Sequence, residues 1–208
     1  MHPNPTFRRE ARARNLAFAR SRAFGQLTIC GHKGPLAAHV PFLLNADASE
    51  GEVHLMRSNP VARALSTPQA ALLSVSGPDG YISPDWYEMP DQVPTWNYVA
   101  VHIRGTLERM AGAELRDVLD RLSASIEERL PKTPWHSSKM TPGVMERMMR
   151  SLVPCRLQVM EIDGTWKLSQ NKPDAARLGA VSGVSEASAP GQEHAALADL
   201  MRAVLSGS

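Results

Sequence analysis

The residues best suited to chemistry form a short polar run, Arg57-Ser58-Asn59, followed one helical turn later by Arg63. The run lies between a predicted strand over 52–56 and a short predicted helix over 61–66, for which Asn59 is the N-cap and a proline the first residue. A guanidinium, a hydroxyl and unpaired backbone N–H groups meet at such a point, and together they suit a phosphate. The same residue types also occur in an ordinary capped turn that faces solvent, so both interpretations stay open.

Two further places could border a flat ring. His39 and Pro41 share one face of an alternating segment over 36–44, where an imidazole lies beside a backbone position that has no N–H. Trp96 and Tyr98 lie where a proline-rich loop meets the longest predicted strand, and such rings can stack on an aromatic ligand. Each place also has a plainer interpretation: a histidine hydrogen-bonded in a barrel wall, and a loop that packs over the core.

Standard catalytic and metal-binding patterns are absent from the sequence. It contains no GxSxG, HExxH, GxxxxGK[ST] or GxGxxG, which argues against nucleophile-elbow hydrolases, zincins, P-loop NTPases and Rossmann folds. The 7 histidines show no metal-ligand spacing, and Cys30 and Cys155 form no CxxC pair. We therefore expect no metal site and two reduced thiols.

The charge of the chain is nearly balanced. Its 23 Lys+Arg and 21 Asp+Glu give a net charge of +2 over 208 residues, which excludes a strongly polycationic nucleic-acid protein. Because no helix-turn-helix with a basic second helix is visible, the sequence does not support DNA binding. No apolar run approaches the roughly 20 residues that cross a bilayer, and no secretory signal follows the first arginines. We expect a cytoplasmic protein with no membrane partner.

The hydrophobic pattern predicts an α+β fold, mainly antiparallel β, in which helices flank a small closed or half-open barrel. Strand signals cover residues 26–30, 36–44, 52–56, 70–76, 81–83, 96–110 and 156–171, with a turn at 77–80. Helix signals cover residues 7–22, 61–66, 113–130, 141–149, 173–181 and 192–205. We expect one domain over 1–181, a flexible linker over 182–191 and a C-terminal helix over 192–208.

Four blocks of sequence carry a family resemblance. They are AHVPF at 38–42, YIS and WY within 81–87, PTWNY at 94–98 followed by AVHIRG at 100–105, and KLSQN at 167–171. In this order, from about residue 3 to about residue 180, the blocks resemble the PaiB-type family, whose members are described as FMN-binding negative transcriptional regulators. The resemblance implies an FMN-binding split β-barrel of the pyridoxamine-phosphate-oxidase kind, a homodimer with the flavin at the subunit interface.

Carried over by position, the resemblance also implies site residues. The FMN phosphate would lie on four residues at the strand end: Arg57, Ser58, Asn59 and Arg63. The flavin ring would be bordered by three residues of one strand: His39, Val40 and Pro41. Five residues would close the site, from the same or the partner subunit: Trp96, Asn97, Lys167, Gln170 and Asn171. One departure is Lys172, where the family often has arginine, because lysine keeps the charge but lacks the planar fork.

The resemblance leaves the activity open. The flavin could serve a regulator or sensor, or an FMN-dependent oxidoreductase of the flavin reductase or oxidase type. A further alternative is a split barrel that binds another planar cofactor such as haem, with His39 or His102 as the ligand, or an empty one that serves protein interaction. His39, His102 and Tyr98 are the candidate proton donors, and no catalytic acid or base is assigned.

Overall fold

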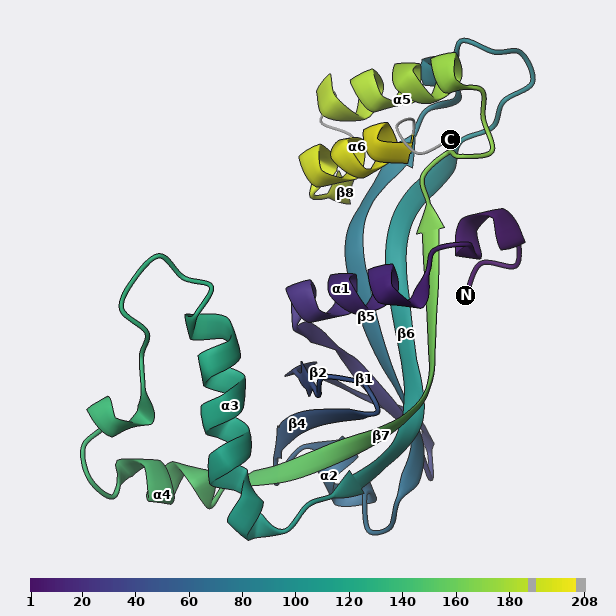
Figure 1. Ribbon diagram of the computed structural model, residues 1–208. Coiled ribbons are helices and arrows are strands. Elements are labelled where there is room, and N and C mark those ends of the chain that lie inside the picture. The colour runs from purple at the N-terminus through teal and green to yellow at the C-terminus, as the bar shows by residue number, and fades with distance from the viewer. Residues whose placement is uncertain (187–189, 205–208) are drawn as a thin grey trace. The chain divides into compact units, whose positions relative to one another are not determined.

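The computed structural model describes residues 1–186 and 190–204 of the 208-residue chain (Figure 1). Its α-helices are α1 (Arg12–Arg22), α2 (Pro60–Ala64), α3 (Leu115–Glu127), α4 (Val144–Met149), α5 (Asp174–Glu186) and α6 (His194–Ala203). Its strands are β1 (Phe24–Gly31), β2 (Gly34–Pro41), β3 (Leu43–Leu44), β4 (Glu50–Met56), β5 (Gln69–Ile82), β6 (Thr95–Arg109), β7 (Leu152–Lys167) and β8 (Gly191–Gln192). Short 3-10 helices lie at Pro5–Arg8, Pro84–Tyr87, Gly112–Glu114 and Ser137–Lys139.

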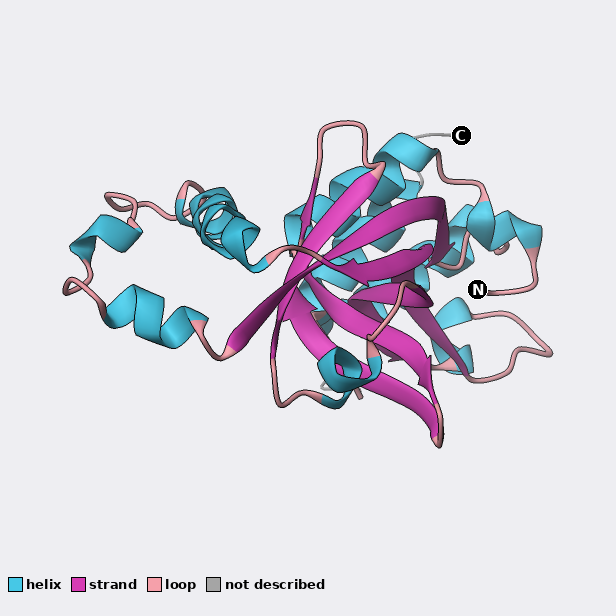
Figure 2. Cartoon of the chain, turned by 90° about the horizontal axis from the view of Figure 1, so that it is seen from below, coloured by secondary structure: helices cyan, strands magenta, loops and turns pink. Residues whose placement is uncertain are grey.

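Within the described residues the strands form one sheet in the order β2-β1-β5-β6-β7-β4-β3, with β8 added beside β5. The pairings of β1 with β2 and β5, and of β4 with β3 and β7, are antiparallel. The sheet is strongly curled (Figure 2). Strand β2 comes close to β4, yet these two strands are not hydrogen-bonded neighbours. A strongly curled antiparallel sheet with flanking helices confirms the predicted α+β split-barrel class.

The chain forms two compact units. Unit 1 comprises Met1–Asn15, Ser76–Val101 and Asp163–Ser208, and unit 2 comprises Leu16–Val75 and His102–Ile162. The three longest strands, β5, β6 and β7, therefore contribute residues to both units. Unit 1 is assembled from segments that are far apart in sequence. The domain bounds expected from the sequence stay a prediction.

The β1–β2 hairpin of unit 2 forms as its sequence pattern predicts. Leu27, Ile29, Ala38 and Val40 are buried, while the residues between them face outward. The predicted strand over 36–44 is interrupted, however. The N–H of Phe42 donates to the carbonyl oxygen of Ala23 over 3.0 Å, so β2 ends at Pro41 and β3 pairs with β4 instead.

In unit 1 the segment 182–191, predicted as a flexible linker, contains the end of α5 and the start of the short strand β8. Helix α5 continues to Glu186, because Val184 lies in its buried face, and β8 pairs with Asp79 and Gly80 of β5. Residues 187–189 lie outside the described residues. Helix α6 packs against α5 and buries Leu197, Ala198 and Met201, so the predicted C-terminal helix is present as His194–Ala203. Residues 205–208 of that prediction also lie outside the described part.

Two predicted boundaries in unit 1 are wrong. The predicted turn over 77–80 is part of the continuous strand β5, where the distant β8 supplies hydrogen-bond partners that a local pattern cannot reveal. The strand predicted to reach residue 171 ends at Lys167, because Ser169 adopts a left-handed conformation with φ of 60° and turns the chain.

Candidate cofactor-binding site

The polar run at the end of β4 is the best-formed anion site among the predicted residues. The side chain of Asn59 accepts the N–H of Val61 over 2.8 Å, so Asn59 caps α2 as predicted. Nε of Arg57 donates to the carbonyl oxygen of Arg150 over 2.7 Å, which holds the guanidinium while the side chain stays exposed. Ser58 is exposed beside it. The turn therefore presents a fixed guanidinium and a hydroxyl to solvent.

Positive charge continues along α2. Arg63 is exposed and has no ion pair with any carboxylate in the described ranges, 1–186 and 190–204. Arg109, at the end of β6, donates to the carbonyl oxygen of Ala62, a contact that the sequence analysis missed. The first turn of α2 carries no acidic residue. Since nothing in this turn opposes an anion, the residues present fit a phosphate group.

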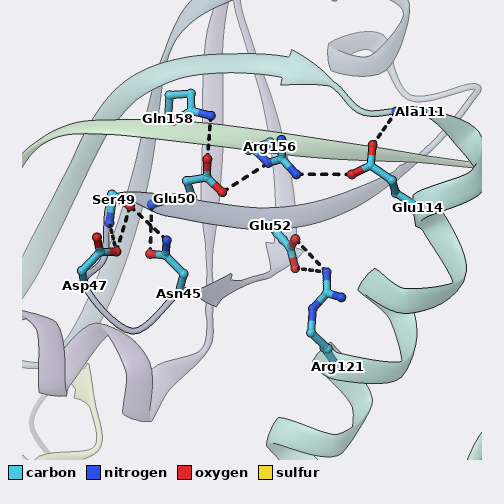
Figure 3. A network of polar contacts seen from close by, with 10 residues as sticks. All are labelled: Asn45, Asp47, Ser49, Glu50, Glu52, Ala111, Glu114, Arg121, Arg156 and Gln158. Carbon is cyan, nitrogen blue, oxygen red and sulfur yellow. Dashed lines mark hydrogen bonds and ion pairs between the residues drawn. The ribbon is translucent and has the colours of Figure 1, made fainter.

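Polar contacts on β4 help to fix the strand that leads into this turn (Figure 3). Glu52 accepts two hydrogen bonds from Nη2 of Arg121 on α3, both over 2.8 Å. Glu50 accepts a hydrogen bond from Gln158 of β7 over 2.9 Å and forms an ion pair with Arg156. These contacts tie β4 to a helix on one side and to its neighbouring strand on the other.

The predicted ring-bordering residues lie on β2, which packs against α2 within unit 2. His39 is exposed and stacks on Phe24 of β1, with ring centroids 6.4 Å apart and planes at 21°. Pro41 is half-buried, whereas the side chain of Val40 points into the core. Only the backbone of Val40 can therefore border a ligand on this face, and Phe24 is an aromatic neighbour that the sequence analysis did not single out.

Trp96 and Asn97 belong to unit 1, and strand alternation places them on opposite faces. Trp96 is 40% exposed, and its Nε1–H donates to Oδ1 of Asp79 over 3.1 Å. Asn97 is fully buried, and its Nδ2 donates to Oγ of Ser169 over 2.8 Å. Ser169 also shares a hydrogen bond of 2.8 Å with the hydroxyl of Tyr87. Asn97 thus holds a buried polar cluster together, while Trp96 faces solvent.

The remaining predicted residues lie in the turn after β7. The Lys167 ammonium donates to the hydroxyl of Thr95, and burial, with a smaller effect from Lys172, lowers its pKa. Gln170 folds back onto its own turn, since its side chain accepts the N–H of Leu168 over 2.7 Å. Asn171 is exposed. Lys167 and Gln170 would have to break the hydrogen bonds described above to contact a ligand with the same atoms, whereas Asn171 would not.

Lys172 has a local role in unit 1. Its ammonium lies 5.1 Å from the centroid of the Tyr87 ring and donates to Oε1 of Gln92. A cavity of about 510 Å³ lies nearby, between residues 86–89 and the first half of α5. None of the predicted site residues lines this cavity.

The structure also bears on metal and thiol chemistry. In the part of the chain that the structure describes, no group of three or more His, Cys, Asp or Glu side chains could hold a metal ion. Both cysteines are free: Cys30 is exposed and Cys155 is buried. Burial raises the pKa of the Cys155 thiol to about 11, against a smaller lowering effect of Arg109.

A split antiparallel barrel with a basic turn at a strand end, beside a hairpin that exposes the rings of His39 and Phe24, fits the class of flavin-binding barrel proteins. A sequence model of the family described as "Putative FMN-binding domain" matches residues 1–161. The chain belongs to this family, whose cofactor is FMN, and this confirms the FMN prediction. This match, together with the Bacillus subtilis relative described next, confirms the PaiB-type resemblance.

Two kinds of relative are similar to this chain. Protease synthase and sporulation protein PAI 2 of Bacillus subtilis is 29% identical over 157 residues, 74% of this chain and 75% of that protein. Among solved structures, the FAD and haem binding protein from Mycobacterium smegmatis superposes with a TM-score of 0.59 at 17% identity, over 77% of this chain and 73% of that one. The flavocytochrome Anf3 from Azotobacter vinelandii gives 0.57 at 16% identity, over 80% and 72%. At these identities the two structures support the fold.

None of the helices in residues 1–186 and 190–204 combines the length and the apolar character that would let it span a membrane.

Proposed function

We propose that this chain is a homodimeric, PaiB-like FMN-binding protein with a negative regulatory role in transcription, and that the flavin lies between the two subunits. The observation that carries the proposal is the basic turn at Arg57, Ser58 and Arg63, which lies within the residues matched by the FMN-binding family. The regulatory part rests on the PaiB-type resemblance, and the similarity to the Bacillus subtilis protein over three quarters of both chains supports that family relationship.

Each group of site residues has a proposed task. Arg57 and Arg63 bind the phosphate by charge and Ser58 by its hydroxyl, while Asn59 caps α2 and so fixes the turn that carries these residues. His39, Pro41 and the backbone of Val40 border the flavin ring. Trp96, Lys167 and Asn171 close the site from the partner subunit. Asn97 and Gln170 act one step away, by holding the strand and turn that carry those residues.

Exposed apolar side chains on the outer faces of unit 2 support a second subunit. Phe24 is 53% exposed and Met160 is 81% exposed, although both lie within strands. We propose that the second subunit covers these side chains. A cytoplasmic location stays a prediction, supported by the two unpaired cysteines.

The test combines a visible spectrum of the purified protein with mass spectrometry of whatever it releases on denaturation. The proposal expects flavin absorption bands and a released mass equal to that of FMN. A haem-type Soret band would overturn it. Oxidation of NAD(P)H by the FMN-loaded protein would favour the oxidoreductase alternative, whereas a salt-sensitive shift of its own promoter DNA would favour the regulator.

A further inference from the structure

Residues 131–151, here called the arm, connect α3 to β7 in unit 2 and contain no buried residue. The arm nevertheless carries six large apolar side chains: Trp135, Met140, Val144, Met145, Met148 and Met149. Met148 alone is 57% exposed. Burying these apolar side chains against another surface would lower the free energy of the protein, which is typical of an interaction site.

The arm forms one wall of an apolar groove of about 320 Å³. Leu119 of α3 and Leu152 of β7 line it together with Trp135 and the methionines of the arm. Methionine is flexible and polarisable, which suits a surface that must adapt to the side chains of a partner. The groove is therefore shaped to receive apolar side chains from outside the unit.

Three arginines, Arg116 on α3 and Arg147 and Arg150 at the end of α4, lie within three residues of side chains that line the groove. Its two nearby acids, Asp120 and Glu146, are both paired with Arg116, at 3.0 and 3.5 Å. Arg147 and Arg150 are exposed at the end of α4, and neither forms an ion pair with a carboxylate among the described residues. The complementary surface should thus present apolar side chains between acidic ones.

Such a surface occurs in unit 1 of the same chain, over residues 85–93. Its three acids, Asp85, Glu88 and Asp91, are exposed and have no ion pair within residues 1–186 and 190–204. Between and beside them, Met89 is 37% exposed and Val93 is 71% exposed. Prolines at both ends and inside the segment restrict its backbone, so little conformational entropy would be lost on docking.

We propose that the arm of one copy receives residues 85–93 of a second copy, with Met89 and Val93 in the methionine groove and the acids facing Arg147 and Arg150. In a dimer with a two-fold axis this contact occurs twice, because each copy carries both surfaces. This inference rests on the homodimer of the proposed function. It adds a second contact region to that dimer, apart from the flavin site.

The first test is analytical ultracentrifugation of charge-reversal variants of the full chain. Arg147→Glu/Arg150→Glu is expected to raise the dimer dissociation constant at least tenfold, and so is Asp85→Lys/Glu88→Lys. Combining all four substitutions should restore most of the affinity, because the charges are exchanged. The control Arg9→Glu/Arg202→Glu changes the net charge by the same amount as the arm variant on exposed residues elsewhere and should leave dimerisation unchanged.

The second test is a disulfide between two different copies. In a Cys30→Ser background, one tagged protein carries Met148→Cys and one untagged protein carries Val93→Cys. Mixing them under mild oxidation is expected to give a product that contains both chains, which a contact within one chain cannot produce. Replacing Val93→Cys by Ala13→Cys, at an exposed position of α1 outside residues 85–93, should give much less of it.

The outcomes separate this contact from the proposed function. A wild-type chain that stays monomeric at all concentrations with FMN present overturns both. A dimer whose dissociation constant is unchanged by both charge reversals, and which yields no mixed disulfide, overturns the arm contact while leaving the shared flavin site. Loss of dimerisation without rescue by the four-fold variant also contradicts the pairing.

Discussion

Asn97 and Ser169, which are 72 positions apart, share a buried hydrogen bond of 2.8 Å between Nδ2 and Oγ. One residue belongs to PTWNY and the other to KLSQN, the two most specific strings in the sequence. Ser169 holds a left-handed conformation at φ of 60°, and Tyr87 bonds to the same hydroxyl. The two strings therefore meet inside unit 1, where they fix the turn that follows β7.

This cluster predicts different stabilities for two substitutions at Ser169. Ser169→Ala removes the hydroxyl and leaves the amide of Asn97 and the Tyr87 hydroxyl without their partner, which should lower the free energy of unfolding by about 1–3 kcal/mol. Ser169→Gly loses the same bonds but adopts the left-handed conformation without a Cβ penalty. It should therefore be more stable than Ser169→Ala by about 1 kcal/mol. Urea unfolding measures both, and equal stabilities would speak against the strained turn.

Gly105 allows β6 and β7 to approach closely in unit 2. A Cβ at this position would lie 1.9 Å from the carbonyl oxygen of Gln158. Gly105→Ala should accordingly destabilise the protein by about 1–3 kcal/mol or more, since the backbone must move. Gly112→Ala is the matched control, because no heavy atom lies within 4 Å of a Cβ there. If thermal unfolding shifts equally in the two variants, the close approach is wrong.

The elements that follow from local pattern were predictable, and those that depend on distant partners were not. Alternation indicated the β1–β2 hairpin, and Asn59 followed by proline indicated the start of α2. Gly77 and Gly80 resembled a turn, but pairing with β8, far along the chain, keeps that segment in β5. The same pairing orders Gly191, which the Ser-, Ala- and Gly-rich composition had assigned to a linker.

For the candidate site, the sequence indicated which residues could bind an anion, but it did not indicate all the side chains that surround the predicted residues in the fold. The basic turn around Arg57 is as expected, because capping and exposure at a strand end depend on neighbours in sequence. Asn97 shares the buried face of β6 with Val99, Val101 and Ile103, so its burial follows from strand alternation, whereas its partner Ser169 comes from a distant turn that no local pattern reveals. Phe24 was missed because its aromatic contact, with His39, comes from the hairpin partner rather than from its own neighbours.

The two cysteines should differ sharply in reactivity. Cys30 is exposed, whereas burial raises the pKa of Cys155 to about 11 and removes the thiolate that attacks thiol reagents. A chromogenic disulfide reagent at pH 8 is expected to modify one thiol in the folded protein and two after unfolding. The Cys30→Ser variant should show none until it unfolds. Rapid modification of folded Cys30→Ser would mean that Cys155 is accessible.

His54 should make stability depend on pH. Burial lowers the pKa of His54 below its usual 6.5, and its buried Nδ1 has no hydrogen-bond partner among the described residues. The unfolded chain therefore binds more protons than the folded one between the lowered pKa and 6.5. The associated stability is fully present above pH 6.5 and is lost as the pH falls through this window.

The substitution that tests this dependence is His54→Phe, which removes the titrating group from β4. Between pH 6.5 and 5 the free energy of unfolding of the variant should fall less than that of the wild type. The difference in slope should correspond to less than one proton taken up on unfolding. Exposed His39→Phe serves as the comparison and should leave the slope close to that of the wild type. An unchanged slope in His54→Phe would assign the acid sensitivity to other groups.

The most direct test of a phosphate-binding turn is to titrate FMN and riboflavin, which share the ring and differ in the phosphate, into the wild type and Arg57→Ala. We expect the wild type to bind FMN more tightly than riboflavin. Arg57→Ala should weaken FMN by about 1.5–3 kcal/mol, roughly 10- to 150-fold, and leave riboflavin unchanged. Equal affinities for the two flavins, or an Arg57→Ala variant that binds FMN as tightly as the wild type, would contradict the account.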